Sequence, residues 1–331
     1  MKRLFSGVKP TGDLHLGNYL GAIKQWVEMQ DGYEAIYGIV DYHAMTATYD
    51  PKELEEYVFK CCCNYLACGL DPEKSILMIQ SQVPLHTELT WFLNCLTPVS
   101  WLERVPTFKD KVQQQADNIN LGLLDYPVLM AADIIIYKAE VVPVGEDQLP
   151  HLELAREIIR RFTSQFGEVF PEPQAIMGKV RRIKGLDGSE KMGKSLNNCI
   201  YLYETKEEIW AKISKAVTDP ARIKKSDPGN PDICNIFSLH KMLSTQEVQD
   251  KVVEGCRGAT IGCIECKRWL TDAMDEELSP IREKYFYYME RPEEVSEIFT
   301  DGNKKAAALA EQTMQEVYEK IGLKYKFLGK R

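Results

Sequence analysis

Short apolar runs and amphipathic runs alternate through the first half of the chain. Four runs are short, rich in aliphatic residues and bounded by polar or turn-forming residues, as buried strands are. These four runs cover residues 2–8, 33–41, 74–80 and 139–145. Apolar positions recur at helical spacing over residues 17–30, 50–67, 85–96, 123–137 and 146–162. The alternation predicts an α/β fold with a doubly wound parallel sheet, whose ligands bind beyond the carboxyl ends of the strands.

The second half of the chain is dominated by helical patterns. A capping box of Thr205 and Glu208 begins one predicted helix, and a second box, Ser244 with Glu247, begins another. A turn-rich linker, KSDPGNPD, separates the two. The patterns divide the chain into an α/β domain (1–185), a glycine-bracketed loop (186–195), a smaller all-helical domain (196–290) and a C-terminal helical segment (291–331).

Composition and charge exclude some classes of protein. The longest apolar run, YPVLMAADIIIY, is shorter than the ~20 residues that span a bilayer, and the N-terminus lacks the apolar core of a signal peptide. We therefore expect a cytoplasmic protein that does not cross a membrane. The formal net charge of −8 argues against a surface covered with phosphate contacts. Basic clusters around residues 179–184 and 222–225 nevertheless leave RNA binding open.

The stretch FSGVKPTGDLHLGNYLGA, residues 5–22, joins the first predicted strand to the first helix. It fits neither the complete P-loop pattern nor a dinucleotide fingerprint. It does predict a glycine-lined helix N-terminus, whose free N–H groups and positive dipole end suit an anion. There Gly17 would let a base or ribose approach, and His15 and Asn18 would offer hydrogen bonds to phosphate oxygens. The alternative is a tight turn with a solvated histidine.

A second candidate segment is GSEKMGKSLNN, residues 188–198, in which Lys191 and Lys194 lie in a glycine-bracketed loop. Two ammonium groups on such a loop can neutralise the charge that develops on a phosphate during its transfer. The alternative is a lysine-rich loop that only contacts solvent.

Together, HLGN and KMGKS resemble the HIGH and KMSKS signatures of the class I aminoacyl-tRNA synthetases. The segment VPVGEDQLPHLEL is similar to the ATP-facing segment of the tryptophanyl and tyrosyl branch. IVDYHAMT, LMAADIIIY and AVTDPARI extend the resemblance to bacterial tryptophanyl-tRNA synthetases over nearly the whole chain. Three positions depart from familiar patterns: Asn18 ends the first signature, Gly193 replaces a serine in the second, and Lys9 stands where relatives carry glutamine.

The resemblance implies a Rossmann-like catalytic domain of the HUP type, a KMSKS-type loop and a helical anticodon-binding domain. It implies a homodimer that uses ATP and Mg²⁺ to join L-tryptophan to tRNA(Trp), with no DNA partner. Lys194, Lys191, His15 and Asn18 would carry catalysis. ATP would contact Lys9, Pro10, Thr11, Gly17, Asn18, Gly145, Glu146, Asp147, Ile183, Lys191, Met192, Gly193, Lys194 and Ser195.

The amino-acid site is expected on the helix DYPVLMAADIIIY. Tyr126, Met130, Asp133 and Tyr137 share one helix face, and a carboxylate buried there needs a partner. An indole N–H is a donor that fits this acceptor, but so is a phenol O–H, and a structural arginine could pair with Asp133 instead. The resemblance favours tryptophan, with Tyr126, Gln148 and His43 holding its ammonium group. The predicted tryptophan contacts are Asp133, Phe5, Gly7, His43, Tyr126, Met130, Val142, Val144 and Gln148.

Four of the ten cysteines form the pattern C-x21-C-x6-C-x2-C at Cys234, Cys256, Cys263 and Cys266. Four thiolates suit zinc or an iron–sulfur cluster, and only one of the two short C-x2-C pairs usual for zinc is present. The compact part of the pattern is similar to the cluster loop of helical DNA-repair glycosylases, and the family resemblance adds a subset with a [4Fe–4S] cluster. We expect that cluster, with Zn²⁺ or free thiols as alternatives. The remaining cysteines, Cys95 among them, are expected to be small apolar fillers.

Other functions remain open at this stage. One alternative is a tyrosyl-tRNA synthetase-like ligase. Another is a non-ligase nucleotidyltransferase with an HxGH-type site, although a helical region as large as the one after Ser195 is unusual for that class. A third is a non-catalytic RNA-binding paralogue, which would not be expected to keep Lys191, Lys194 and Asp133.

Overall fold

The protein is built on one five-stranded parallel sheet. The computed structural model describes residues 1–106, 118–178, 183–189 and 191–325. The strand order is β3-β2-β1-β4-β5. The strands are β1 (Arg3–Val8), β2 (Glu34–Ile39), β3 (Ser75–Ile79), β4 (Val141–Val144) and β5 (Gln174–Met177). The first four are confirmed predictions. The fifth, QAIM, was missed because it is a four-residue edge strand whose side chains are half-buried or exposed.

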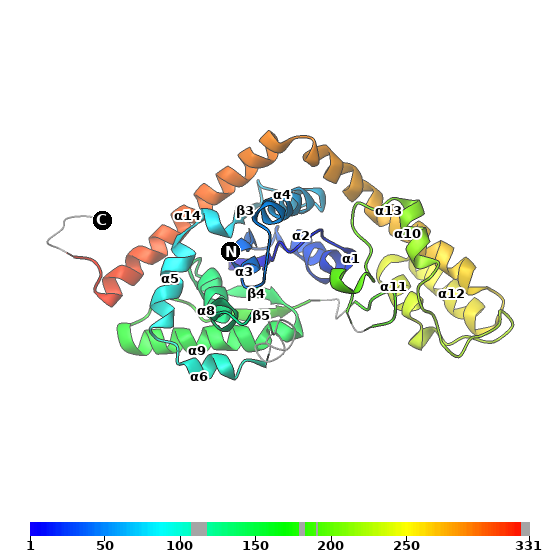
Figure 1. Ribbon diagram of the computed structural model, residues 1–331, viewed down its shortest axis with the longest axis horizontal. Helices are drawn as coiled ribbons and strands as arrows, with labels where there is room; N and C mark the ends of the chain where they lie inside the picture. The colour runs from blue at the N-terminus through cyan, green and yellow to red at the C-terminus, as the bar shows by residue number, and fades with distance from the viewer. Residues whose placement is uncertain (107–117, 179–182, 190, 326–331) are drawn as a thin grey trace.

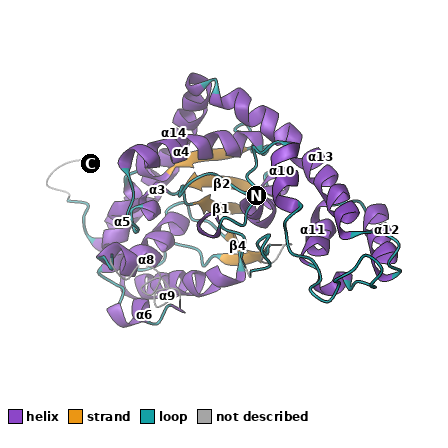
Figure 2. Cartoon of the chain, turned by 45° about the vertical axis from the view of Figure 1, so that its right-hand side comes forward, coloured by secondary structure: helices purple, strands orange, loops and turns teal. Residues whose placement is uncertain are grey.

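The sheet is covered on both faces, as the prediction of a doubly wound fold requires (Figure 2). Alternate residues of β1 and β2 point into different cores, because successive side chains of a strand face opposite sides of the sheet. Leu4 and Tyr37 lie in the core under α4 (Pro51–Ala67). Phe5 and Ile36 lie in the core under α8 (Leu121–Ile135) and α9 (Leu149–Phe166). Both cores are aliphatic and aromatic, so the sheet is held by apolar burial on both sides.

The five predicted helical segments of the α/β part are confirmed, whereas the short helices α3 (Asp41–Ala44) and α6 (Val99–Glu103) were not predicted. The other helices are α1 (Leu16–Asn18), a π-helical turn (Tyr19–Ile23), α2 (Lys24–Met29), α4 (Pro51–Ala67), α5 (Leu85–Asn94), α8 (Leu121–Ile135) and α9 (Leu149–Phe166). Short 3₁₀ turns occupy Gln80–Gln82 and Glu146–Gln148. Among the described residues, no helix combines the length and the apolar character needed to cross a bilayer.

The rest of the chain is helical, as expected. After a 3₁₀ turn at Lys194–Leu196 come α10 (Lys206–Ile213), a 3₁₀ turn (Pro231–Ile233), α11 (Asn235–Leu243), α12 (Gln246–Arg257), α13 (Cys263–Met289) and α14 (Pro292–Ile321). The Thr205–Glu208 capping box is confirmed. The second box is wrong by one residue: Thr245 is the N-cap of α12 and accepts from Val248 N, whereas Ser244 ends α11 and bonds to His240. The two hydroxyl residues are adjacent, so the pattern alone did not separate them.

Two long helices tie the helical part to the sheet. In Figure 1, α13 and α14 form the arms of an inverted V above α4. The predicted boundary at residue 290 falls in the turn between them. Along α14, Gly302 lies against the backbone of β3, and Asn303 Oδ1 accepts a hydrogen bond of 2.8 Å from Ile79 N. This contact covers the edge of β3, which would otherwise present unpaired backbone groups.

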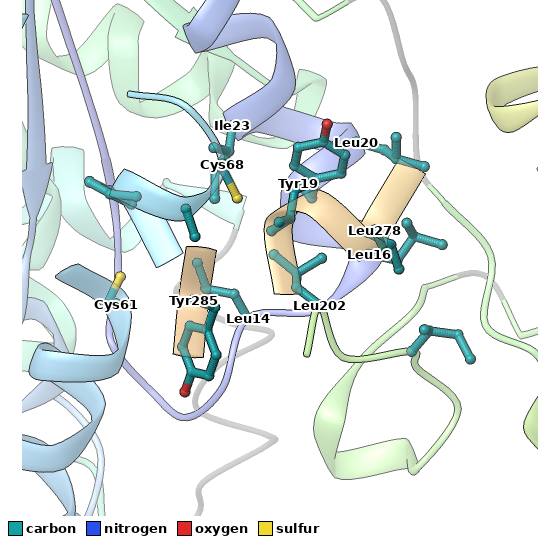
Figure 3. Close-up of a cluster of buried hydrophobic side chains, with 14 of the residues drawn as sticks. Leu14, Leu16, Tyr19, Leu20, Ile23, Cys61, Cys68, Leu202, Leu278 and Tyr285 are labelled. Carbon is teal, nitrogen blue, oxygen red and sulfur yellow. The ribbon is translucent and has the colours of Figure 1, made fainter. Parts of the chain in front are cut away.

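A buried apolar cluster joins the first helix to the helical part (Figure 3). Leu14 and Leu16 flank His15, Leu202 follows the lysine loop, and Leu278 and Tyr285 come from α13. All five side chains are nearly inaccessible to solvent. The cluster therefore fixes the HLGN segment relative to both the lysine loop and α13.

Candidate active site

A cavity of about 390 Å³ opens where the strand order changes direction, between β1 and β4. The two strands pair through one residue pair, Leu4 with Val141. Beyond that pair, Pro143 has no N–H to donate to β1, and a side chain, Ser6 Oγ, donates to Pro143 O at 3.3 Å instead. A crevice at the carboxyl ends of two such strands is where open α/β sheets bind ligands.

The cavity is lined by every residue predicted to contact tryptophan. Phe5 and Gly7 come from β1, and Val142 and Val144 from β4. The remaining five are His43, Tyr126, Met130, Asp133 and Gln148. The walls are mainly apolar, with the polar groups gathered at a few points, which is the usual composition of a small-molecule site. Lys9 and Gly145, expected to face ATP, also line this cavity.

Asp133 is the most deeply buried charged group of the cavity, with 1% of its surface exposed. Its partners are not an arginine but His43 Nε2 at 2.7 Å, His86 Nδ1 at 2.7 Å and Gln80 Nε2 at 2.6 Å. Burial alone would raise the pKa of this carboxyl, but the hydrogen bonds from His43 and His86 outweigh it and hold the pKa well below its usual range. Asp133 is therefore an ionised acceptor.

The groups expected to hold an ammonium also line the cavity. The Tyr126 hydroxyl is 2.8 Å from Nε2 of His151, which is buried. Gln148 donates to Asp147 Oδ2 at 2.9 Å. His43, which was grouped with them, bonds to Asp133 and meets the Tyr126 ring edge-on. Sequence reasoning did not predict this partner for His43.

The HLGN corner is a capped helix start. His15 Nδ1 accepts from Gly17 N at 3.1 Å, and Asn18 Oδ1 accepts from His15 N at 3.1 Å. Burial, followed by the charges of Lys194 and Lys191, lowers the pKa of His15 to about 4. The ring is therefore neutral at pH 7, and because Nδ1 accepts, Nε2 carries the proton. His15 Nε2 and the Asn18 amide nitrogen are thus donors suited to a phosphate oxygen.

The lysine loop is held by a residue that sequence reasoning missed. The Asn198 side chain, only 3% exposed, accepts from Gly193 N at 2.8 Å. Its amide nitrogen lies within 3.2 Å of Asp187 Oδ1, Ser189 Oγ and Lys191 O. One asparagine therefore forms hydrogen bonds with backbone and side-chain groups on both sides of the turn.

Within the loop, the described residues have different environments. The Lys194 side chain lies against Gly12, where an added Cβ would come within 3.2 Å of Lys194 Nζ, and burial lowers the pKa of that ammonium. Lys191 is exposed. The side chains of Met192 and Ile183 are buried in the core, so they could meet ATP only through their backbone. The side chain of Ser195 lies outside the described residues.

Backbone bonds join the HLGN corner to the segment that follows the KMGKS loop. Leu16 N donates to Ile200 O at 2.8 Å, and Leu202 N donates to Leu14 O at 3.3 Å. Of the other residues assigned to ATP, Pro10 is buried, while Thr11, Glu146 and Asp147 are exposed. The structure thus brings two lysines, a neutral histidine and a capped helix N-terminus to one corner.

Known proteins resemble this chain throughout its length. The family model for class I tRNA synthetases specific for W and Y matches residues 1–279. The tryptophan–tRNA ligases of Deinococcus radiodurans and Thermotoga maritima are each 45% identical to it, over 97% and 98% of this chain and 99% and 100% of their own. The chain belongs to the tryptophan type of the class I tRNA synthetases. The Campylobacter jejuni tryptophanyl-tRNA synthetase, in a crystal structure with ADP and tryptophan, has a TM-score of 0.87 and 37% identity, over 97% of this chain and 99% of that one.

Family membership resolves the alternatives left open by the sequence. The relatives are curated as tryptophan–tRNA ligases, so the chain is an enzyme of this type rather than a non-ligase nucleotidyltransferase or a non-catalytic paralogue. The tyrosine-type alternative is likewise not favoured.

The cysteine motif of this synthetase lies far from the crevice, in the helical part. The half-buried Cys234, Cys256, Cys263 and Cys266 line one cavity of about 20 Å³. Within the described part of the chain, no three His, Cys, Asp or Glu side chains have a geometry that could hold a metal ion. The four predicted ligands thus share a cavity without forming a ready-made coordination sphere.

The other six cysteines behave mostly as predicted. Cys61, Cys62, Cys63, Cys68 and Cys199 are buried. Burial raises the pKa of the Cys61 and Cys63 thiols to about 12, so they stay protonated and act as small apolar groups. The prediction is wrong for Cys95, which is exposed just after α5.

Proposed function

We propose that this chain activates L-tryptophan with ATP in the crevice between β1 and β4 and transfers the tryptophanyl group to tRNA(Trp). One observation carries the proposal. A mainly apolar cavity is lined by the ionised Asp133 and by Gly21 and Ala22, which follow closely, along the chain, on the corner built from His15, Asn18 and Lys194. An amino acid with a single ring N–H fits the first part, and a polyphosphate fits the second.

The reaction needs positioning more than it needs acid–base chemistry. The carboxylate of tryptophan attacks the α-phosphate of ATP, and pyrophosphate leaves. The nucleophile is already ionised at pH 7, so no protein base is required. The two lysines of the loop would stabilise the charge on the phosphates, while His15 and Asn18 donate hydrogen bonds to phosphate oxygens. The terminal ribose hydroxyl of tRNA then attacks the carbonyl of the adenylate, and AMP leaves.

Mg²⁺ would add positive charge to the triphosphate. Among the described residues, no cluster of three His, Cys, Asp or Glu side chains is suited to a metal ion. We therefore expect the ion to be bound mainly through the phosphates, as Mg²⁺ often is. The protein's own contribution is then Lys194, Lys191 and the side chains of His15 and Asn18. Contrary to the prediction from the sequence, the backbone N–H groups of the helix start are not free, because those of Leu16, Gly17 and Asn18 already donate to Ile200 O, His15 Nδ1 and His15 O.

In the amino-acid cavity, Asp133 would accept the indole N–H. The ring would contact Met130, Phe5, Val142 and Val144. Tyr126 and Gln148 would hold the ammonium group. A phenol could also donate to Asp133, so the carboxylate alone does not exclude tyrosine. We expect the length and width of the apolar part of the cavity to add that discrimination.

ATP–pyrophosphate exchange with each of the twenty amino acids tests the proposal. The wild-type chain is expected to exchange with tryptophan alone, and the tRNA-dependent step to charge tRNA(Trp). Asp133→Ala should lower kcat/KM for tryptophan about 10²-fold, the size expected for a lost hydrogen bond to a charged group. The KM for ATP should change by less than about threefold. Unchanged amino-acid preference in this variant, or exchange with tyrosine in the wild type, would contradict the proposal.

We also propose a [4Fe–4S] cluster at the four cysteines, with Zn²⁺ as the alternative. The arrangement supports this because all four cysteines line one cavity that Arg222 also lines. Arg222 Nη1 lies 3.6 Å from Cys256 Sγ, and the buried Lys267 follows Cys266 directly. Both cations would offset the negative charge of four thiolates. The sulfur ligands fit either group, and we expect the group to stabilise the fold of the helical part.

Metal analysis distinguishes the two candidates. Anaerobically purified protein should be brown and contain about four iron and four sulfide per chain, the stoichiometry of the cluster. Cys256→Ser should lower the iron content and the thermal stability of the helical part, whereas Cys95→Ser, at an exposed cysteine elsewhere, should change neither. Colourless protein with one zinc per chain would favour the alternative, and metal-free protein of full stability would contradict both.

Two further expectations belong to the proposal. The helical part would read the anticodon of tRNA(Trp), and the chain would act as a homodimer. Trp91 on α5 and Leu121 at the start of α8 are 67% and 76% exposed, on two helices that pack together, which supports an apolar contact with a second copy. Light scattering at micromolar protein would reveal a monomer if the dimer is wrong.

A further inference from the structure

A buried hydrogen-bond chain extends behind Asp133, away from the cavity. Asp133 Oδ1 lies 2.7 Å from His86 Nδ1, and His86 Nε2 lies 2.7 Å from the Tyr137 hydroxyl. Gln80 Nε2 lies 2.6 Å from the same carboxylate oxygen. His86, Gln80 and Tyr137 are each 0% exposed and, unlike Asp133, do not line the cavity. They cannot touch a substrate in this arrangement.

The direction of each hydrogen bond follows from the chemistry of the groups. The Asp133 carboxylate is ionised and only accepts, so His86 must carry its proton on Nδ1. His86 Nε2 then accepts, and the Tyr137 O–H donates to it. The Gln80 amide cannot turn over, because its Oε1 accepts from Tyr42 N at 3.0 Å and its nitrogen therefore faces Asp133. Every donor in this chain of hydrogen bonds thus points toward the Asp133 carboxylate.

The two carboxylate oxygens of Asp133 have different hydrogen-bond partners. Oδ1 receives two bonds, from His86 and Gln80, which use its two lone-pair directions. Among the residues that the structure describes, only His43 bonds to Oδ2, at 2.7 Å, so one lone pair remains for a donor in the cavity. The same bonds fix the plane of the carboxylate and therefore the direction of that lone pair.

We infer that His86 and Gln80, with Tyr137 behind His86, are positioning residues that aim one acceptor site of Asp133 at the ring N–H of the substrate. The inference rests on the proposed function. It adds that specificity for an indole depends on three residues that never contact it. A residue of this kind changes discrimination between substrates with and without the N–H, whereas a residue that only stabilises the fold affects both alike.

The test compares tryptophan with β-(3-benzothienyl)alanine, in which sulfur replaces the ring N–H and the shape is nearly kept. The quantity measured is the ratio of kcat/KM for tryptophan to kcat/KM for the analogue in pyrophosphate exchange. His86→Leu removes the donor to Asp133, and Tyr137→Phe removes only the hydroxyl that fixes the tautomer of His86. Tyr37→Phe is the matched control, because Tyr37 is equally buried and its hydroxyl donates to Trp26 O, outside this chain of bonds.

The wild type is expected to prefer tryptophan by at least about tenfold, the value of one hydrogen bond to a charged group. His86→Leu should lower that ratio roughly tenfold and Tyr137→Phe roughly threefold, mainly through the KM for tryptophan, while Tyr37→Phe leaves it unchanged. An equal loss for both substrates would overturn the inference. If His86→Leu does not fold, Tyr137→Phe decides alone, since an unchanged ratio there also overturns it. Failure of the wild type to use tryptophan at all would instead contradict the proposed function.

Discussion

Asn198→Ala tests whether the lysine loop must be held in place before it can act. In the structure, the Asn198 amide accepts one bond from Gly193 N and donates to acceptors on Asp187, Ser189 and Lys191. The amide has two N–H groups, so the three acceptors share two donors. Its full set therefore amounts to about three hydrogen bonds, each contributing about 1 kcal/mol net.

Losing about 3 kcal/mol of loop ordering lowers the population of the productive loop about 10²-fold, since 1.4 kcal/mol corresponds to a factor of ten. The rate constant for adenylate formation should fall by that factor. Tryptophan affinity should change by less than about threefold, because Asn198 does not line the tryptophan cavity. Rapid-quench measurement of the first turnover, with tryptophan binding followed separately by fluorescence, gives both quantities.

Asn64→Ala is the matched control. Asn64 is buried to nearly the same extent, at 2% against 3%, but its amide donates within its own helix to Lys60 O. This variant should keep the rate of adenylate formation. The reasoning is refuted if Asn198→Ala retains the wild-type rate, or if both variants lose rate and tryptophan affinity in parallel, as general destabilisation would cause.

Two further predictions concern the same corner. Lys194→Ala should slow adenylate formation about 10²- to 10³-fold while tryptophan still binds, because a charge-stabilising donor is lost; near-normal turnover would contradict its role. The pKa of His15 is lowered to about 4 in the folded chain, against 6.5 when the chain is unfolded. Between these two pH values only the unfolded chain binds the proton, so the free energy of unfolding falls as the pH drops through that window. His15→Asn, which retains a side-chain acceptor for Gly17 N, should make the loss of stability between pH 7 and pH 5 shallower, as judged by urea midpoints; an identical loss in both proteins would argue against a buried neutral histidine.

Much of the fold could be predicted from the sequence because its signals are local. The strands at residues 2–8 and 33–41 are apolar on both faces. Asp50 is the N-cap of α4 and accepts from Lys52 N, as the predicted capping position requires. β5 could not be predicted, because a four-residue strand at a sheet edge has too few buried positions to form a pattern. Such a strand is defined by its pairing with β4, which is a tertiary contact.

The sequence predicts the residues that would bind a ligand better than it predicts the residues that position them. Asp133 could be proposed because a carboxylate inside an apolar helix is costly unless it has a partner. The identity of that partner could not, because His86 and Gln80 are about 50 residues away along the chain and their own surroundings carry no motif. Asn198 likewise carries no signal in the sequence beyond its place in a polar loop. Polar residues whose function is to orient others become visible only when the fold brings their partners together.

The central claim is that ATP binds between the HLGN corner and the KMGKS loop, with tryptophan in the adjoining cavity. A crystal structure of the protein with tryptophan and a non-hydrolysable ATP analogue tests it most directly. The account predicts the indole nitrogen within hydrogen-bonding distance of Asp133 Oδ2, and the α-phosphate near His15, Asn18 and Lys194. A nucleotide bound elsewhere, with this crevice empty, would contradict it.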